Sequence, residues 1–387
     1  MAPDGAADGA FISLGDAGAA QSDAASALGN TSYGFIAAEP IVEDGSDAGL
    51  GIAANLVERM DELSAALPLL QEARVSLVMI VQAIKLQTPA AMEQVFSLVE
   101  DAARRGLEVR PVPVLNGDDG YYPNATNIAA FAPLVRNLVA QWKARGLVPT
   151  TMVIDMEPPK ELTTALASGD LTRAAPAEHV DRSRYAAAVT GYAALADELH
   201  RAGWKIAVTT QAQLLADYDD GDDDLRQYFN VVLDGVPWDQ LDFQLYRSAY
   251  EGLADGLDSY FVYYAAQRAA AQYPGIKVGL GLGLTHPGPV FPDTPTEGSQ
   301  ALRADLEAAV SAGVPRELIT VYNLKGVLLG PPVCQSVLGC SATEYVYLPN
   351  DPHRWFIDAS GAQAPAVNSS TAKLWSQFDF MDSVLDP

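Results

Sequence analysis

Residues 151–159 read TMVIDMEPP, a short apolar run that ends in two acidic residues and a double proline. The run is too short and too closely bounded by proline for a helix, so we expect a buried β-strand. Side chains alternate between the faces of a strand, so Asp155 and Glu157 point the same way, about 6–7 Å apart. Hydrogen bonding and mutual repulsion would push the pKa values of two such carboxyl groups apart, which is what acid–base chemistry needs. We therefore interpret this strand end as a candidate active site.

The same pattern recurs along the chain and alternates with amphipathic helices. We predict eight strands, at residues 33–39, 75–84, 107–116, 150–157, 204–213, 241–249, 276–284 and 318–324. Helices are predicted at residues 91–105, 127–145, 185–202 and 299–312, with a terminal one at residues 371–384. The first four are each followed by a glycine, which is typical of a left-handed helix end before a strand: Gly106, Gly146, Gly203 and Gly313.

Eight βα units fit a chain of 387 residues as one TIM barrel. We predict an α/β fold with a single (β/α)8 domain over residues 31–387 and long βα loops. The alternative is a doubly wound open sheet, but no glycine fingerprint follows the first predicted strand. Gly279, Gly281 and Gly283 alternate within one predicted strand, which indicates small residues that face a barrel interior.

The charge of the chain excludes some classes of partner. Its formal net charge is −25 and its sequence pI is near 4.3. Nucleic acids and anionic membranes attract basic surfaces, so we expect neither as a partner. No apolar run is long enough to span a membrane. We expect a monomer whose acidity keeps it soluble.

Two features indicate export from the cytoplasm. Residues 1–30 are rich in alanine, glycine, aspartate and serine, and we predict a flexible segment like the linker that follows a signal or lipoprotein segment. Cys334 and Cys340 lie six positions apart in a stretch rich in proline and glycine, which favours a small disulfide over two unpaired thiols. We therefore expect a secreted or cell-surface protein.

Polar side chains stand at the predicted carboxyl ends of the strands, which meet at one face of a barrel. Besides the two acidic residues, the candidates are Glu39, Gln82, Asn116, Gln211, Gln213, Gln244, Tyr246, Arg247, and Tyr322 or Asn323. Amides, a phenol and carboxylates without a serine, lysine or histidine nucleophile are typical of sugar chemistry. Buried amides need partners, which favours the glutamines as substrate donors. Loop aromatics could stack on sugar rings: Tyr121, Tyr122, Trp238, Tyr250 and Trp355.

The Asp-x-Glu on the fourth strand, together with Gln244-x-Tyr246 on the sixth, resembles the chitinase-type (family 18-like) glycoside hydrolases and related endo-β-N-acetylglucosaminidases. The resemblance implies a barrel over about residues 33–384 that cleaves β-linked, N-acetylated glycans by substrate-assisted retention. It would make Glu157 the general acid and Asp155 the group that orients the 2-acetamido group. Tyr246 would hydrogen-bond the acetamido oxygen.

The chain departs from that family at several positions. Val153 and Thr150 stand where the family has two further aspartates. The third strand lacks a Ser-x-Gly-Gly pattern, and the eighth ends without the usual tryptophan. Family 25-like lysozymes also carry an Asp-x-Glu on the fourth strand, so this motif alone does not choose between the two families.

Other functions stay open at this point. A barrel that binds carbohydrate without cleaving it would explain the missing aspartates, although the retained Asp-x-Glu opposes it. A metal-dependent phosphodiesterase would use Glu39, Asp155 and Glu157 as ligands of a divalent cation. The absence of histidines on the first two strands counts against it, because phosphate cleavage needs a base and a charge partner. The acidic pair could also cap the following loop, and Glu39 could form a structural ion pair.

Residues 217–224, from Asp217 to Asp224, read DYDDGDDD and resemble a calcium loop. The density of carboxylates and the central glycine suit an oxygen-ligated ion, but the glutamate at the twelfth position of an EF-hand is missing. A solvated acidic loop is the favoured alternative. No cofactor motif is visible, so we predict no cofactor unless Ca²⁺ binds at this loop.

Overall fold

The computed structural model describes residues 51–54, 63–64, 67–68, 70–71, 76–159, 162, 180–218, 222–250, 254–283, 299–322 and 364–383. Eight parallel strands form one sheet in the order β3-β2-β1-β8-β7-β6-β5-β4. The strands are β1 (Gly51–Ala54), β2 (Ser76–Gln82), β3 (Val109–Val114), β4 (Thr151–Asp155), β5 (Lys205–Gln211), β6 (Gln240–Gln244), β7 (Lys277–Leu282) and β8 (Ile319–Tyr322). The predicted α/β class with eight parallel strands is confirmed.

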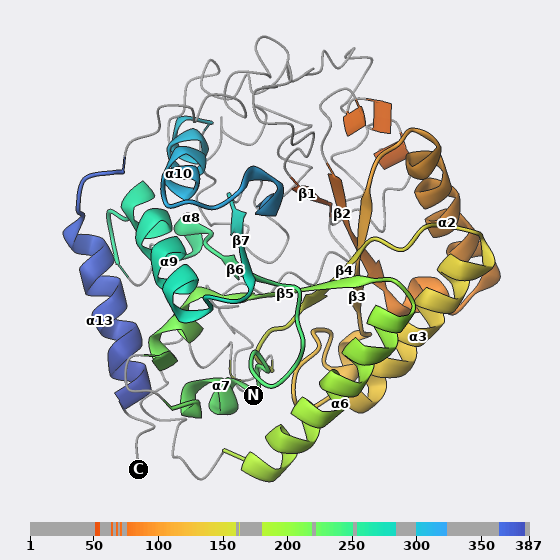
Figure 1. The fold of residues 1–387 in the computed structure, drawn as a ribbon, viewed down its shortest axis with the longest axis horizontal. Coiled ribbons are helices and arrows are strands. Elements are labelled where there is room, and N and C mark those ends of the chain that lie inside the picture. The colour runs from red at the N-terminus through yellow and green to blue at the C-terminus, as the bar shows by residue number, and fades with distance from the viewer. Residues whose placement is uncertain are drawn as a thin grey trace, which may run out of the picture.

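The sheet curls until its two edge strands, β3 and β4, lie beside each other (Figure 1). Thr150 Oγ1 donates a hydrogen bond of 2.6 Å to the carbonyl oxygen of Val109, the first residue of β3. Between these two strands the described residues form no backbone ladder. The sheet is therefore a curled, barrel-like one whose edges are bridged by a side chain.

Long helices pack around the outside of the curled sheet (Figure 1). They are α2 (Pro89–Arg104), α3 (Ile128–Ala144), α6 (Arg182–Arg201), α9 (Ser259–Gln272), α10 (Ser299–Ser311) and α13 (Ser369–Ser383). The shorter elements are α7 (Asp224–Phe229), α8 (Arg247–Tyr250), η2 (Ala83–Leu86), η3 (Gly117–Asp119), η5 (Ala212–Tyr218) and η6 (Arg316–Leu318). None of the helices described here has the length and apolar character that a membrane crossing requires.

The predicted helix ends are confirmed at all four glycines. Gly106, Gly146, Gly203 and Gly313 have φ angles of 76°, 67°, 87° and 95°, in the left-handed region. A residue with a Cβ is strained there, so glycine stops each helix and turns the chain toward the next strand. This local signal explains why the helix boundaries agree with the sequence to within a few residues.

Two strands differ from the prediction. The place between β2 and β8 is taken by Gly51–Ala54, whereas we had assigned it to residues 33–39, which lie outside the described residues. Its sequence, GIAA, is short and consists mostly of residues with low strand propensity, so no strand pattern is recognisable there. The sixth strand ends at Gln244 instead of residue 249, because residues 247–250 turn into helix α8.

Glycines make room inside the barrel, as the alternation in β7 predicts. The strand register places Gly279 beside Asp242 and Gly281 beside Gln244. A Cβ added at Gly279 would collide with the Asp242 carboxylate and lie 2.6 Å from the carbonyl oxygen of Leu318. The two glycines thus leave interior space to the polar side chains of β6.

We expect Gly279→Ala to destabilise the fold by about 1–3 kcal/mol or more, because the methyl group has no space and backbone must shift. Gly275→Ala is the control, since nothing lies within 4 Å of its added Cβ and the residue is exposed. Urea unfolding at neutral pH measures both. Equal midpoints for the two variants would contradict the interior role of Gly279.

Candidate active site

The two carboxyl groups predicted from the sequence lie on the same side of the chain. Asp155 is the last residue of β4, and Glu157 follows two positions later. The amide nitrogen Nε2 of Gln244, at the end of β6, donates to Asp155 Oδ1 at 2.9 Å and to Glu157 Oε1 at 3.2 Å. Asp155 is 3% exposed and Glu157 1%. One buried amide group therefore holds both carboxyl groups at the carboxyl end of the strands.

Burial dominates the electrostatics of this pair. It raises the pKa of Asp155 to about 7, although the Gln244 hydrogen bond works in the opposite direction. Burial also raises the pKa of Glu157 well above its usual range, and the negative charge of Asp155 raises it further. Near neutral pH the pair therefore retains a proton.

Two further amide side chains, those of Gln211 and Gln213, are linked to Gln244 through Tyr250. Gln213 Nε2 donates to Gln211 Oε1, and the Tyr250 hydroxyl lies 3.3 Å from both Gln213 Oε1 and the carbonyl oxygen of Gln244. The backbone N–H of Ala212 donates to the same hydroxyl at 3.2 Å. Tyr250 therefore ties the ends of β5 and β6 together. Because it is fully buried, the expectation that Tyr250 stacks on a sugar is wrong.

Tyr246 lies at the same end of the barrel interior. Its ring packs on Tyr322 with centroids 5.5 Å apart, and a Cβ at Gly281 would lie 3.2 Å from its hydroxyl. Burial first, and then the charge of Asp155, raises the pKa of Tyr246. The phenol thus stays protonated beside the acidic pair and is able to donate a hydrogen bond.

The other predicted site residues are not brought to the pair by any hydrogen bond seen in the described part of the chain. Gln82 Nε2 donates to the Tyr121 hydroxyl at 3.2 Å, and the carbonyl oxygen of Asn116 accepts from the N–H of Tyr121 at 3.1 Å. Arg247 instead pairs with the buried Asp305 of α10 at 3.5 Å. Substrate-binding roles for these residues stay predictions.

Several predictions concern residues outside those described. They are Glu39, Asn323, the cysteines Cys334 and Cys340 with their disulfide, Trp355, and the segment 1–30. Trp238 is described, and it is buried against Tyr192 with ring centroids 6.0 Å apart. The expectation that Trp238 stacks on a sugar is therefore wrong.

A cavity of about 50 Å³ lies inside the barrel and begins at Asp155. Asp155, Gln244 and Tyr246 line it at one end, and Asp242 and Arg110 contribute to its wall further along the strands. Its size gives room for about three waters. Burial raises the pKa of Asp242 to about 7, so the barrel holds another acid that sequence reasoning had not identified.

Asn124 is a second residue that the sequence analysis did not single out. Its side-chain nitrogen donates to the carbonyl oxygens of Tyr122 and Glu157, each at 3.2 Å. Its side-chain oxygen accepts from the N–H of Thr126 at 2.9 Å. This is asparagine turn chemistry, so the spacing Asn124-x-x-Asn127 was the signal that could have located it.

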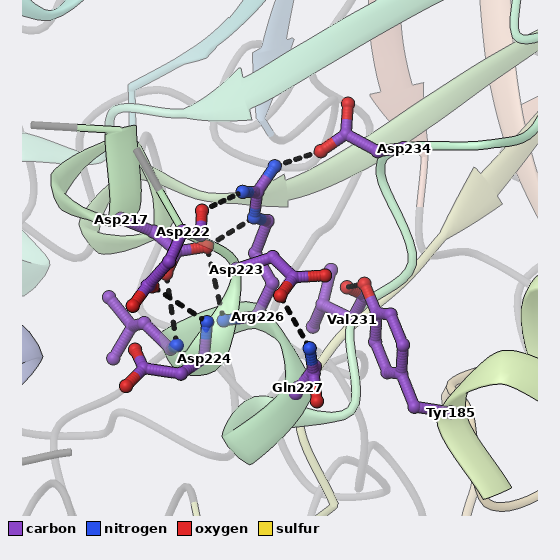
Figure 2. Close-up of polar contacts among 10 residues, drawn as sticks. Tyr185, Asp217, Asp222, Asp223, Asp224, Arg226, Gln227, Val231 and Asp234 are labelled. Atoms are coloured by element: carbon purple, nitrogen blue, oxygen red, sulfur yellow. Dashed lines mark hydrogen bonds and ion pairs between the residues drawn. The ribbon is translucent and has the colours of Figure 1, made fainter. Parts of the chain in front are cut away.

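The acidic loop is built around an arginine (Figure 2). Asp217 is fully buried and accepts from the N–H groups of Leu225 and Arg226 and from the Arg226 guanidinium, which also pairs with Asp234. Oxygen atoms of Asp217, Asp222 and Asp224 come within 4.8 Å of one another. The interpretation as a solvated loop is wrong for Asp217 and for Asp224, which are buried. The alternative, that Ca²⁺ binds at this loop, stays a hypothesis.

The sequence matches no known family profile and no curated protein. Solved structures with a similar arrangement include a GH18 chitinase from Pseudoalteromonas aurantia, with a TM-score of 0.44 and 11% identity over 71% of this chain and 94% of that one. A chitinase from Chromobacterium violaceum gives 0.45 and 14%, covering 72% and 94%. The YdjI aldolase from Escherichia coli gives 0.36 and 12%, covering 75% and 78%. The fold assigned above rests on the strand order and register of this chain.

The raised pKa values predict how stability depends on pH. A carboxyl group with a raised pKa in the folded state stabilises the fold below its unfolded pKa of about 4, and this contribution is lost as the pH rises through the folded pKa. We expect Glu157→Gln to melt at least about 2 °C above wild type at pH 8, with the difference vanishing toward pH 4.

Glu198→Gln is a control of opposite sign. Arg136 lies 2.7 Å from the Glu198 carboxylate and lowers its pKa, so the wild type gains stability above pH 4 and loses it in acid. Melting curves from pH 4 to pH 8 compare both variants. A Glu157→Gln curve parallel to that of wild type would contradict a buried, proton-sharing pair.

We expect Ca²⁺ and EDTA to leave the melting temperature unchanged, because Arg226 already supplies the positive charge that Asp217 needs. Asp217→Asn should cost about 3 kcal/mol, since Arg226 loses its buried partner, whereas Asp222→Asn at an exposed position should cost little. Thermal melts with 5 mM CaCl₂ or EDTA measure this. A rise in melting temperature with Ca²⁺ that Asp217→Asn abolishes would instead establish a calcium site.

Proposed function

We propose that the chain is a glycoside hydrolase that cleaves β-linked, N-acetylated glycans with retention of configuration. One observation carries the proposal. Gln244 bridges two buried carboxyl groups at the carboxyl end of the barrel strands, where such folds build their sites. The sequence resemblance to chitinase-type hydrolases supports the choice of substrate.

Glu157 is the proposed general acid. Its raised pKa keeps it protonated near neutral pH, so that it can deliver the proton to the glycosidic oxygen as the bond to the leaving sugar breaks. Asp155, as the ionised partner, becomes the carboxylate that orients the 2-acetamido group of the substrate. The acetamido oxygen attacks the anomeric carbon, and water later opens this intermediate with Glu157 acting as the base.

Gln244 and Tyr246 position the reacting groups. Both hydrogens of the Gln244 amide are directed to the carboxyl pair, so the amide fixes the two groups relative to each other. The Tyr246 phenol, protonated and buried beside Asp155, donates to the acetamido oxygen. Removing either group leaves the acid in place but misaligns the nucleophile.

A barrel that binds glycans without cleaving them is the second candidate function. It is favoured by the burial of Glu157, which is 1% exposed and which a glycan must reach. The metal-dependent phosphodiesterase has no such support. It would need Glu39 as a third ligand, and Glu39 lies outside the described residues. Secretion and a monomeric state remain part of the proposal.

Glu157→Gln should reduce glycan hydrolysis at least about a hundredfold, because the amide has no proton to give to the leaving oxygen. The test is turnover of a panel of chitooligosaccharides, N-glycans and peptidoglycan fragments at neutral pH. Glu198→Gln, on the surface of α6, is the matched control and should keep wild-type turnover.

The outcomes separate the two candidate functions. Turnover by wild type that Glu157→Gln abolishes establishes a hydrolase and its acid. Glycan binding without turnover in either protein moves the assignment to the binding barrel. Turnover that survives the substitution would overturn the role of Glu157.

A further inference from the structure

The loop between β3 and α3 is built to hold one side chain in place. Gly120 and Tyr121 have φ angles of 93° and 56°, two consecutive left-handed residues. Such a conformation is costly for tyrosine and is found where the surrounding structure enforces it. The N–H of Leu115 donates to the Tyr121 carbonyl oxygen at 2.7 Å, and Asn127 Nδ2 donates to that of Tyr122 at 2.8 Å. These bonds fix the backbone of Tyr122.

The same loop is fastened to the candidate acid. The Asn124 amide nitrogen donates to the carbonyl oxygens of Tyr122 and Glu157, so a single group sets the distance between the two residues. The Tyr192 hydroxyl donates to the Asn124 carbonyl oxygen at 3.0 Å and anchors the loop on α6. Burial raises the pKa of the Tyr122 phenol, and Glu157 is the first of the neighbouring groups that raise it further.

The Tyr122 hydroxyl has no partner for its hydrogen bond in the part of the chain that the structure describes. The residue is 6% exposed, so water does not replace the missing partner. A buried hydroxyl without a partner destabilises the folded state, and phenylalanine would fill the same space without that penalty. Gln244 Oε1, beside the carboxyl pair, likewise has no hydrogen-bond partner among the described residues.

We propose that Tyr122 is a substrate-binding residue of this site, whose hydroxyl forms a hydrogen bond with a sugar oxygen next to Glu157. The inference rests on the proposed function and adds a contact to it. Both side chains are buried, and Asn124 links the two backbones, so we expect a glycan that reaches the acid to lie beside the phenol as well. This role differs from ring stacking, since the ring of Tyr122 is already covered by Tyr121, 4.8 Å away edge to face.

Tyr122→Phe tests the inference because it removes only the oxygen. We expect KM for a hydrolysed glycan to rise about three- to tenfold, the value of one neutral hydrogen bond, with kcat nearly unchanged. The melting temperature of the ligand-free variant should equal or exceed that of wild type. The limbs of the pH–rate profile should not move, because Glu157 keeps its surroundings.

Tyr185→Phe is the matched control. Its buried hydroxyl donates to the Val231 carbonyl oxygen at 2.9 Å, so the variant should lose stability and keep KM. We therefore expect Tyr122→Phe to change substrate binding alone and Tyr185→Phe to change stability alone. A merely structural role for the Tyr122 hydroxyl would make both variants behave like Tyr185→Phe.

Each outcome decides the inference separately from the proposed function. Wild-type turnover with an unchanged KM in Tyr122→Phe overturns the inference and leaves the hydrolase standing. If wild type binds glycans without turnover, the same comparison of Kd by calorimetry decides it, and a weaker Kd in the variant supports it. A wild type that neither binds nor cleaves any glycan of the panel overturns both.

Discussion

The site depends on a constraint of electrostatics: two carboxyl groups on one strand end, both buried, cannot both be ionised. Water is the usual means of stabilising two adjacent negative charges, and here it is largely excluded. Gln244 offers two N–H groups, enough to hold one oxygen of each carboxyl group but not to balance two charges. The folded chain therefore has its lowest free energy when the pair retains one proton. At the carboxyl end of the strands the pair therefore still carries a proton near neutral pH.

This arrangement needs space that the barrel interior must supply. In most TIM barrels large branched side chains fill the interior in layers. Here Gly279 and Gly281 stand where such side chains would be, and the neighbouring strand β6 fills the gap with Gln240, Asp242 and Gln244. The polar side chains of β6 can turn inward only because β7 carries none at these positions. Gly281 also lines the cavity, which reaches Asp155 of the acidic pair.

Sequence patterns correctly predicted those features that depend on residues a few positions apart in the chain. The apolar run before Asp155, the two-residue spacing to Glu157 and the glycines that end the helices each lie within a few positions, and the structure agrees with them. The first strand was misplaced because GIAA contains little strand signal, and the sixth strand is shorter than predicted because residues 247–250 form helix α8. Gln244 meets Asp155 across 89 positions of sequence, and no local pattern announces that contact. The bond from Asn124 to the Glu157 carbonyl oxygen spans 33 positions and is equally invisible in local sequence.

A hydrolase and a barrel that only binds glycans would use this site in the same way until the proton is transferred. In either case a ligand must reach the carboxyl pair, and in doing so it can satisfy the Tyr122 hydroxyl and Gln244 Oε1, which are buried without partners among the described residues. Groups held at such a cost imply a ligand but not a reaction. The reaction depends on whether the proton of Glu157 can leave for the glycosidic oxygen, which requires Asp155 to stabilise the charge that develops on the sugar. Burial raises the pKa of both carboxyl groups, so the pair retains a proton near neutral pH that this step can use.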